Sequence, residues 1–367
     1  MTLVHILTGA MRDQNSRGFL FPLLFNHDRI RDTGIRVRFF HRIADAISDC
    51  DALLVDGKAL DAQAPSSGAR LADLLARWSK LTPLGYFDLT DSATTVRPEL
   101  LPHVAQYYKN QLVVDRSVLA SPLYGRRLFT DYYHRADGVE DDPAETSDPI
   151  DPNGIAKLRV SWNSSLANYA WYGPRLAALY ERLPWRRFLF YPGRFESPQT
   201  RRDIGLNCRM NTRYSRRTIA HQRLRTADLL KAYAVADRIS KASYFRELRG
   251  SRLATSPFGW GEINQKDYEC FLSGVAIVKP DVSHLETWPA LFEAGTTYVA
   301  HAWNLHDLVE KVEYFLAHDR EREQIAAQGQ ARYRRQIATR DGHEEFSSRF
   351  HALVDDLRTR ANASAAG

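Results

Sequence analysis

SPFGWGEINQKDYECFLSGVAIVKP, residues 256–280, is the stretch of this sequence that says most about the fold. It follows a strand-forming run and contains Gly259 and Gly261, which let a backbone turn sharply and approach a ligand closely. A helix is expected to begin near Asn264 and to end at Gly274, because glycine is common just after a helix. Backbone amides at the start of that helix can donate to a phosphate. The stretch therefore predicts a strand, a loop, a helix and a strand that hold an anionic ligand.

Two glutamates of this stretch are candidate functional residues. Glu269 lies on the expected helix, on a side that can face a cleft, where a carboxylate can accept hydrogen bonds from a ribose diol. Glu262 has two interpretations that the residues leave open. It can reach a bound sugar through the loop, or it can favour the helix dipole as an amino-end residue.

The first half of the chain alternates strand-forming and helix-forming segments, which is the pattern of a parallel α/β domain. Asp88 and Asp91 stand just past the apolar part of the fourth strand, where the carboxyl ends of such sheets carry ligands. Both are candidate functional carboxylates. The strand-forming runs are TLVHILTGA (2–10), IRVRFF (35–40), DALLVDG (51–57) and LTPLGYFDLTDS (81–92).

A second α/β unit is predicted to begin at residues 186–195, RRFLFYPGRF, with a strand over 188–191 that precedes Arg194. The segment IGLNCRMN, residues 204–211, repeats the arrangement with Arg209. An arginine at the carboxyl end of a strand is well placed to bind an anionic group. We therefore expect both arginines at a binding site.

The segment DGVEDDPAETSDPIDPN at 137–153 is acidic, contains prolines and is predicted to be a solvated loop or linker. A helix is expected after residues 204–211, with Ser215 as its cap and Arg216 and Arg217 in its first turn. Arginines there oppose the helix dipole unless an anion sits nearby. A solvated basic helix face is the simpler interpretation, and we favour it.

Composition limits the classes of function. A chain of 367 residues is expected to form two domains. The net charge of +6 fits an anionic ligand, an acidic polymer or an anionic membrane surface, although codon bias produces the same excess of arginine. The basic residues are dispersed and no nucleic-acid-binding motif accompanies them, so no nucleic-acid partner is expected. No apolar run is long enough to span a membrane, and the beginning lacks the features of a secretory signal, which predicts a cytoplasmic protein.

The pattern of Ser256, a glycine-rich loop, Glu269, a glycine five residues later and an apolar strand resembles the donor domain of GT-B glycosyltransferases, in particular the group 1 and spore-coat-like members. The resemblance implies two Rossmann-like α/β domains that face each other across a cleft. It implies an acceptor domain at 1–183, a nucleotide-sugar donor domain at 184–340, and a carboxyl-terminal helix at 341–367 that packs back on the first domain.

The same resemblance implies roles for individual residues. Glu269 would hold the ribose hydroxyls, and the loop from Ser256 through Gly259 and Trp260 to Gly261 would contact the diphosphate. Arg194 and Arg209 would neutralise the departing phosphates.

One departure from the family pattern concerns the earlier glutamate. Only six residues separate Glu262 from Glu269, and Gly261 stands where retaining members carry a glutamate. The stereochemical outcome therefore stays open. An inverting enzyme needs a base in the first domain, for which Asp88, Asp91 and Asp131 are candidates, each with a loop carboxylate or a helix cap as its alternative.

The sequence thus predicts a metal-independent glycosyltransferase of polysaccharide biosynthesis that transfers a hexosyl or deoxyhexosyl group. The donor is expected to be a nucleotide diphosphate sugar, the acceptor a glycan, lipid-linked or other hydroxyl, and no cofactor is expected. The site is expected to hold no metal because no cluster of histidines, cysteines or carboxylates has ligand spacing. The predicted partners also include an anionic membrane, which the protein would contact peripherally. The alternative is a noncatalytic nucleotide- or sugar-binding protein with a degenerate GT-B fold.

Overall fold

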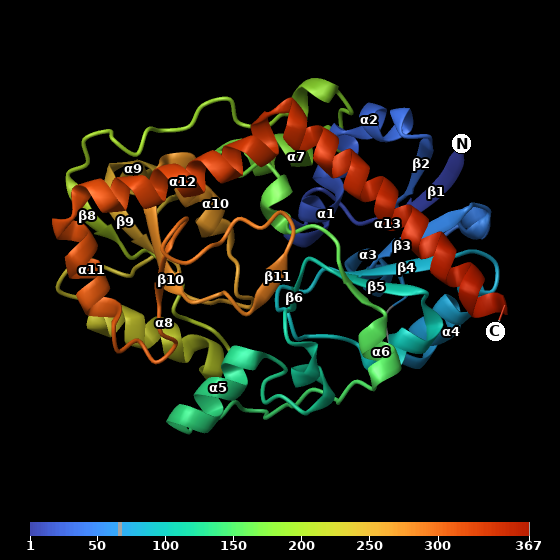
Figure 1. Ribbon diagram of the computed structural model, residues 1–367, viewed down its shortest axis with the longest axis horizontal. Coiled ribbons are helices and arrows are strands. Elements are labelled where there is room, and N and C mark those ends of the chain that lie inside the picture. The colour runs from blue at the N-terminus through green and yellow to red at the C-terminus, as the bar shows by residue number, and fades with distance from the viewer. Residues whose placement is uncertain (65–67, 367) are drawn as a thin grey trace.

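The computed structural model describes residues 1–64 and 68–366 and contains two separate parallel β-sheets, each covered by helices (Figure 1). The prediction of an α/β protein with two Rossmann-like units is confirmed. We call the unit built on strands β1 to β7 the first lobe and the unit built on β8 to β12 the second lobe. The limits of the two domains at residues 183 and 184 stay a prediction.

The sheet of the first lobe has the strand order β2-β1-β3-β4-β5-β7, and its neighbouring strands are all parallel. Every residue of the central strands β3 and β4 is buried, because helices cover both faces. The strands are β1 (Thr2–Leu7), β2 (Ile35–Phe40), β3 (Ala52–Asp56), β4 (Leu84–Asp88), β5 (Gln106–Lys109) and β7 (Leu158–Val160). The helices are α1 (Gln14–Phe25), α2 (His27–Asp32), α3 (Gly57–Gln63), α4 (Gly68–Ser79), α5 (Leu128–Asp137) and α6 (Pro152–Ala156).

The sheet of the second lobe has the order β12-β10-β9-β8, again with parallel neighbours. Its strands are β8 (Ile204–Asn207), β9 (Ser251–Thr255), β10 (Ala276–Pro280) and β12 (Val299–His301). Its helices are α8 (Arg217–Leu229), α9 (Lys241–Gly250), α10 (Gln265–Ser273), α11 (Leu308–Ala317) and α12 (Asp319–Ala338). The helix predicted after the glycine-rich loop is α10, which has Asn264 as its N-cap and ends at Gly274 with a φ of 63°.

Two further elements join the lobes. Strand β6 (Gln111–Val113) of the first half pairs in antiparallel fashion with β11 (Leu285–Thr287) of the second half. The last helix, α13 (Arg340–Ala366), crosses back to the first lobe, where it packs against α2, β3 and β4 (Figure 1). The connection between the lobes carries α7 (Gly173–Tyr180). Short 3₁₀ helices are η1 (Asp45–Ser48), η2 (Pro98–His103), η3 (Arg116–Ala120), η4 (Ser164–Leu166) and η5 (Arg186–Phe188).

The strand predicted over 188–191 is wrong. Phe188 is the last residue of η5, and residues 189–191 are irregular chain in which the carbonyl of Phe190 accepts a hydrogen bond from the side-chain amide of Asn168 at 2.7 Å. The edge of the second sheet is instead formed by β8, which pairs with β9. The apolar run at 188–191 was therefore a misleading strand signal, because Leu189 is buried and Tyr191 packs against Phe21 and Phe25 without either residue joining a sheet.

The acidic segment is not wholly solvated, contrary to the prediction. Asp141 is buried, and its carboxylate accepts hydrogen bonds from the backbone amide of Thr218 at 2.8 Å and from the Thr218 hydroxyl at 2.7 Å. Thr218 lies in the first turn of α8, so Asp141 supplies the acceptor that caps this helix start, while Glu145 of the same segment pairs with Arg216. The N-cap residue of α8 is Arg216, not Ser215.

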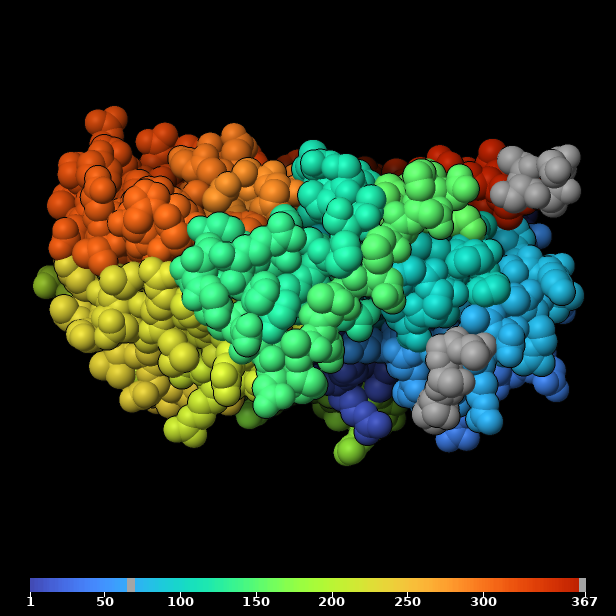
Figure 2. Space-filling model, turned by 90° about the horizontal axis from the view of Figure 1, so that it is seen from below, coloured from blue at the N-terminus to red at the C-terminus, as the bar shows by residue number. Residues whose placement is uncertain are grey.

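Helix α5 and the acidic segment form an arm of the first lobe that rests on the second lobe. In Figure 2 this green part of the chain covers the junction between the blue and the yellow-to-orange surfaces. Asp137 lies 2.7 Å from His221 and 3.0 Å from Arg225, both on α8. The arm therefore fixes the relative position of the lobes along this side.

Replacing Asp141 tests this contact. Asp141→Ala should lower the free energy of unfolding by about 1–2 kcal/mol, because the start of α8 loses its acceptor. Denaturant unfolding measures the change, and Glu140→Ala, at an exposed neighbour in the same segment, should leave it unaltered. Equal stability of the two variants would contradict the capping role.

Candidate functional site

A cavity lies between the lobes at the carboxyl ends of the strands, where open α/β sheets carry ligands. We call it the interlobe cavity. The first lobe lines it with Gln14, Asn15, Gly18, Phe19, Leu89, Asp91, Asn110, Gln111, Trp162, Asn163 and Ser164. The second lobe lines it with Tyr214, Trp260, Gly261, Ile263, Asn264, Gln265 and Tyr268. The glycine-rich turn and the start of α10 thus face the first lobe.

The lining is rich in amides and aromatic rings. Seven of the residues are asparagine or glutamine, five are aromatic, and Asp91 is the single charged group among the described residues that line the cavity. The side-chain oxygen of Asn110 and the side-chain nitrogen of Gln265 are buried without a hydrogen-bond partner. Amides both donate and accept, and buried polar atoms normally find partners. This lining suits an uncharged ligand with many hydroxyl groups and apolar faces.

The glycine-rich turn is held against the first lobe. A Cβ atom on Gly261 would overlap the carbonyl oxygen of Asp91, so only glycine fits this close approach. The Arg127 guanidinium donates to the carbonyl of Trp260 at 2.9 Å and lies 5.3 Å from the centre of its ring. Within the turn, the amide of Gly259 donates to the carbonyl of Gly261 at 3.0 Å. The turn is therefore placed by contacts from both lobes.

Glu262 does not line the cavity, because its side chain is turned into the contact between the lobes and is fully buried. Its carboxylate accepts from the amide of Ala93 at 3.2 Å, from the side chain of Gln111 at 2.8 Å and from the hydroxyl of Ser92 at 3.3 Å. Burial raises the pKa of this carboxyl group. Neither interpretation left open by the sequence describes this arrangement, since Glu262 stands before α10 and bonds to the opposite lobe.

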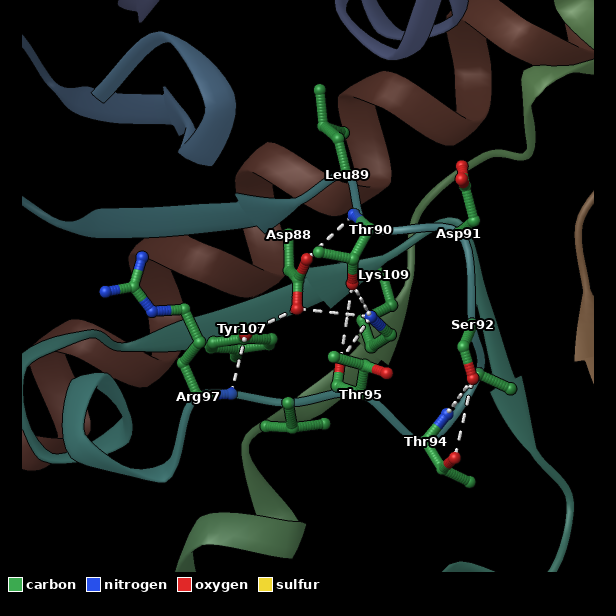
Figure 3. Close-up of polar contacts among 12 residues, drawn as sticks. Asp88, Leu89, Thr90, Asp91, Ser92, Thr94, Thr95, Arg97, Tyr107 and Lys109 are labelled. Carbon is green, nitrogen blue, oxygen red and sulfur yellow. Dashed lines mark hydrogen bonds and ion pairs between the residues drawn. The ribbon is translucent and has the colours of Figure 1, made fainter. Parts of the chain in front are cut away.

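Asp88 is buried beneath the cavity in a closed polar network (Figure 3). Its carboxylate accepts from the Tyr107 hydroxyl at 2.6 Å, from the Lys109 ammonium at 3.1 Å and from the amide of Thr90 at 2.8 Å. These partners, Lys109 foremost, outweigh the effect of burial and lower the pKa of Asp88. Lys109 also donates to the carbonyl of Thr95 at 2.7 Å. The network fixes both ends of the loop that follows β4, and Asp88 does not reach the cavity.

Asp91 lies at the tip of the same loop and lines the cavity. Figure 3 shows its side chain directed away from the network around Asp88. Burial raises the pKa of its carboxyl group, although the charge of Lys58 opposes the rise. The third candidate base, Asp131, accepts from the amide of Tyr124 at 3.0 Å and pairs with Arg135 at 2.8 Å, away from the cavity lining. Asp91 is the carboxylate that can meet a ligand there.

Glu269 and Ser256 are not among the residues that line the cavity. Glu269 is one helical turn beyond Gln265 on α10, and its carboxylate accepts from the Tyr244 hydroxyl at 2.8 Å. Burial raises the pKa of Glu269 to about 7. The Ser256 side chain is buried directly after β9, and its hydroxyl has no hydrogen-bond partner.

The two arginines expected at the site are not brought to the cavity lining. The Arg194 side chain is 86% exposed and lies 3.4 Å from Glu196. Arg209 is neutralised by Glu247, which its Nε contacts at 3.0 Å through both carboxylate oxygens.

Residues 195–345 match the family model described as glycosyl transferase-like. The predicted resemblance to glycosyltransferases is confirmed over these residues. None of the curated proteins compared by sequence matches.

Solved structures that align with this chain include HepE of Anabaena in complex with UDP-glucose, with 10% identity and a TM-score of 0.46 over 96% of this chain and 100% of HepE. A glycosyltransferase from Rickettsia africae aligns with 9% identity and a TM-score of 0.46, over 97% of this chain and 98% of its own. The β-glucosyltransferase of phage T4 aligns with 11% identity and a TM-score of 0.45, over 97% of this chain and 100% of its own.

Sequence reasoning missed the amides of the interlobe cavity. Asn110 directly follows β5, Asn163 comes three residues after β7, and Asn264 precedes α10. An amide just past a strand, or just before a helix that follows a glycine-rich loop, was the available signal. It was obscured because asparagine is also common in turns and helix caps.

Within residues 1–64 and 68–366, no group of three or more histidine, cysteine, aspartate or glutamate side chains is arranged to hold a metal ion. No helix in these ranges is long and apolar enough to cross a membrane.

The pKa of Glu269 leads to a test by pH. The pKa of the Glu269 carboxyl group is about 7 in the folded protein, whereas its ordinary value, expected in the unfolded chain, is 4.5. The protonated group therefore contributes stability that is fully present below pH 4.5 and is lost as the pH rises to 7. Relative to Glu269→Gln, the wild-type free energy of unfolding should therefore fall by on the order of 1–3 kcal/mol across that range. Glu310→Gln, at an exposed site on α11, is the control and should follow the wild type. A constant difference between wild type and Glu269→Gln would contradict the assignment.

Proposed function

We propose that this protein is a glycosyltransferase that moves a sugar from a nucleotide diphosphate sugar to a hydroxyl acceptor. The observation that carries the proposal is the cavity between the lobes, which places Asp91 of the first lobe opposite the turn of a glycosyl transferase-like second lobe. Amides and rings are the side chains that recognise sugar hydroxyls and the apolar faces of sugar rings. The transferred sugar occupies the interlobe cavity in this proposal.

The nucleotide diphosphate lies along the start of α10 in this proposal. The first turn of a helix leaves backbone amides without intrahelical partners, and the helix dipole favours an anion there. The unpartnered hydroxyl of Ser256 and the side-chain nitrogen of Gln265 are further donors beside the turn. Glu269, one turn deeper, holds the ribose hydroxyls. Because these donors meet the growing charge of the leaving diphosphate, the proposal includes a reaction without metal.

Asp91 is the proposed general base. The acceptor hydroxyl attacks the anomeric carbon, its proton passes to the Asp91 carboxylate, and the bond from that carbon to the diphosphate oxygen breaks. The nucleoside diphosphate leaves with the bonding electrons, and this single displacement inverts the anomeric carbon. A raised pKa suits a base because it brings its proton affinity closer to neutral pH. Asp88 and Glu262, whose carboxylates are engaged elsewhere, support the two loops instead.

A second function has one observation in its favour. Glu262 and Asp88 are buried away from the cavity, so the lining offers a single carboxylate. A noncatalytic nucleotide- or sugar-binding protein needs no further carboxylate in its binding site. It would bind the donor without ever releasing nucleoside diphosphate from it.

The test uses a panel of nucleoside diphosphates and the corresponding nucleotide sugars. The melting temperature of the protein is measured with each compound, and the release of nucleoside diphosphate is measured with each nucleotide sugar. One nucleotide should raise the melting temperature, because a ligand that binds only the folded state stabilises it. Its matching sugar should be hydrolysed slowly without acceptor. Asp91→Asn should lower that rate by about 10²–10⁴-fold and leave the thermal shift unchanged, since it removes only proton transfer.

Asp228→Asn is the control, because Asp228 is a 72% exposed aspartate on α8. Stabilisation without hydrolysis of any nucleotide sugar would favour the noncatalytic function. An Asp91→Asn variant that hydrolyses at the wild-type rate would remove Asp91 from the reaction, and no stabilisation by any nucleotide would remove the proposal.

A further inference from the structure

The segment at residues 181–190, between α7 and the second lobe, exposes an unusual set of side chains. We call it the connecting segment. Every residue from 181 to 187 is exposed. Leu183 is 40% exposed, Trp185 47% and Phe190 40%, which concentrates three large apolar side chains in ten residues. In Figure 1 this part of the chain protrudes at the top edge of the molecule, close to α2.

The connecting segment is also basic. It contains Arg182, Arg186 and Arg187 against one acid, Glu181, which accepts a hydrogen bond from the amide of Met11. Arg186 pairs with Asp28 at 2.6 Å. Arg182 and Arg187 form no ion pair with the described residues, so their charges face solvent.

The exposed tryptophan is held in place by its neighbours. The Arg187 guanidinium lies 4.1 Å from the centre of the Trp185 ring, and that ring stacks on Phe188 with 5.6 Å between ring centres. An exposed ring fixed between a cation and a second ring is presented to a partner with little loss of side-chain freedom. Tryptophan with arginine is the combination that accumulates at the boundary between lipid headgroups and acyl chains.

A second cavity opens beside the connecting segment. Tyr180, Glu181 and Pro184 line one side of it. The apolar side chains Leu20, Leu24 and Phe39 of the first lobe line another. It is separate from the interlobe cavity, but α1 contributes residues to both. An apolar cavity beside a basic aromatic surface can receive the hydrocarbon chain of an amphiphile.

We propose that the connecting segment is a docking surface for an anionic lipid bilayer, with the adjacent cavity taking up a lipid chain. The arginines attract anionic headgroups, and Trp185 and Leu183 enter the region below them. A purely polyanionic partner would use the arginines but would leave three apolar side chains in water, so the bilayer fits better. The docking itself does not depend on the proposed transferase activity. If that activity holds, the surface brings a lipid-linked acceptor to the first lobe.

The test is sedimentation of the full-length protein with lipid vesicles, without any nucleotide. Wild-type protein should bind vesicles of phosphatidylcholine and phosphatidylglycerol, and it should bind phosphatidylcholine vesicles much more weakly. The triple variant Arg182→Glu, Trp185→Ser, Arg187→Glu should lose at least about tenfold in affinity, because each basic residue near the surface contributes roughly a fivefold factor.

The control changes the same residue classes elsewhere. Arg201→Glu, Val235→Ser and Arg320→Glu alter two exposed arginines and one exposed apolar residue outside the connecting segment, and should leave binding unchanged. Melting temperatures identify any variant that has failed to fold. The single variant Trp185→Phe provides a second measurement, because brominated lipids should quench wild-type emission and this quenching should decrease in the variant.

Several outcomes would overturn the proposal. They are equal binding by the triple variant and the wild type, absence of wild-type binding to anionic vesicles, and quenching that does not depend on Trp185. Binding to heparin as strong as binding to vesicles, with no quenching, would assign the surface to a polyanion instead. None of these results bears on nucleotide binding or sugar transfer.

Discussion

The buried carboxylate of Glu262 is the interaction from which the geometry of the interlobe cavity follows. It belongs to the second lobe but accepts hydrogen bonds from the loop after β4 and from Gln111 in the first lobe. A carboxylate buried without such donors would be strongly unfavourable, so the two loops stay in contact. This contact places Gly261 against the carbonyl of Asp91. Residues of both lobes then line the cavity.

Each loop is supported by a buried lysine at the carboxyl end of a strand. In the first lobe, Lys109 of β5 pairs with Asp88 at 3.1 Å. In the second, Lys279 of β10 pairs with Asp267 at 2.8 Å and donates to the backbone carbonyl of Glu262. Separating the two partners of such a pair would leave an uncompensated buried charge, which is strongly unfavourable. Each pair therefore holds its loop in one position. Rigid loops suit a site in which donors must be held in place before charge develops.

The sequence predicted secondary-structure elements better than it predicted contacts between residues that are far apart in the chain. Strands β1 to β4 and the limits of α10 were predictable because apolar runs, glycines and caps act within a few residues. The ion pair that neutralises Arg209 was not predictable, because its partner Glu247 lies 38 residues later in the sequence, on α9. The position of Glu262 depends on residues about 170 positions away. Strand ends were a sound guide to where the site lies, yet they did not distinguish Asp91, which reaches the cavity, from Asp88, which lies beneath it.

The return of α13 to the first lobe has a consequence for how the chain is made. Its side chains Phe346 and Phe350 pack on Trp162, and Leu357 lies against Gly85 in β4. During synthesis, this face of the first sheet stays uncovered until α13 has left the ribosome. The amino-terminal half therefore reaches its final packing only after the carboxyl-terminal half exists, and a truncated product would expose apolar surface to chaperones and proteases.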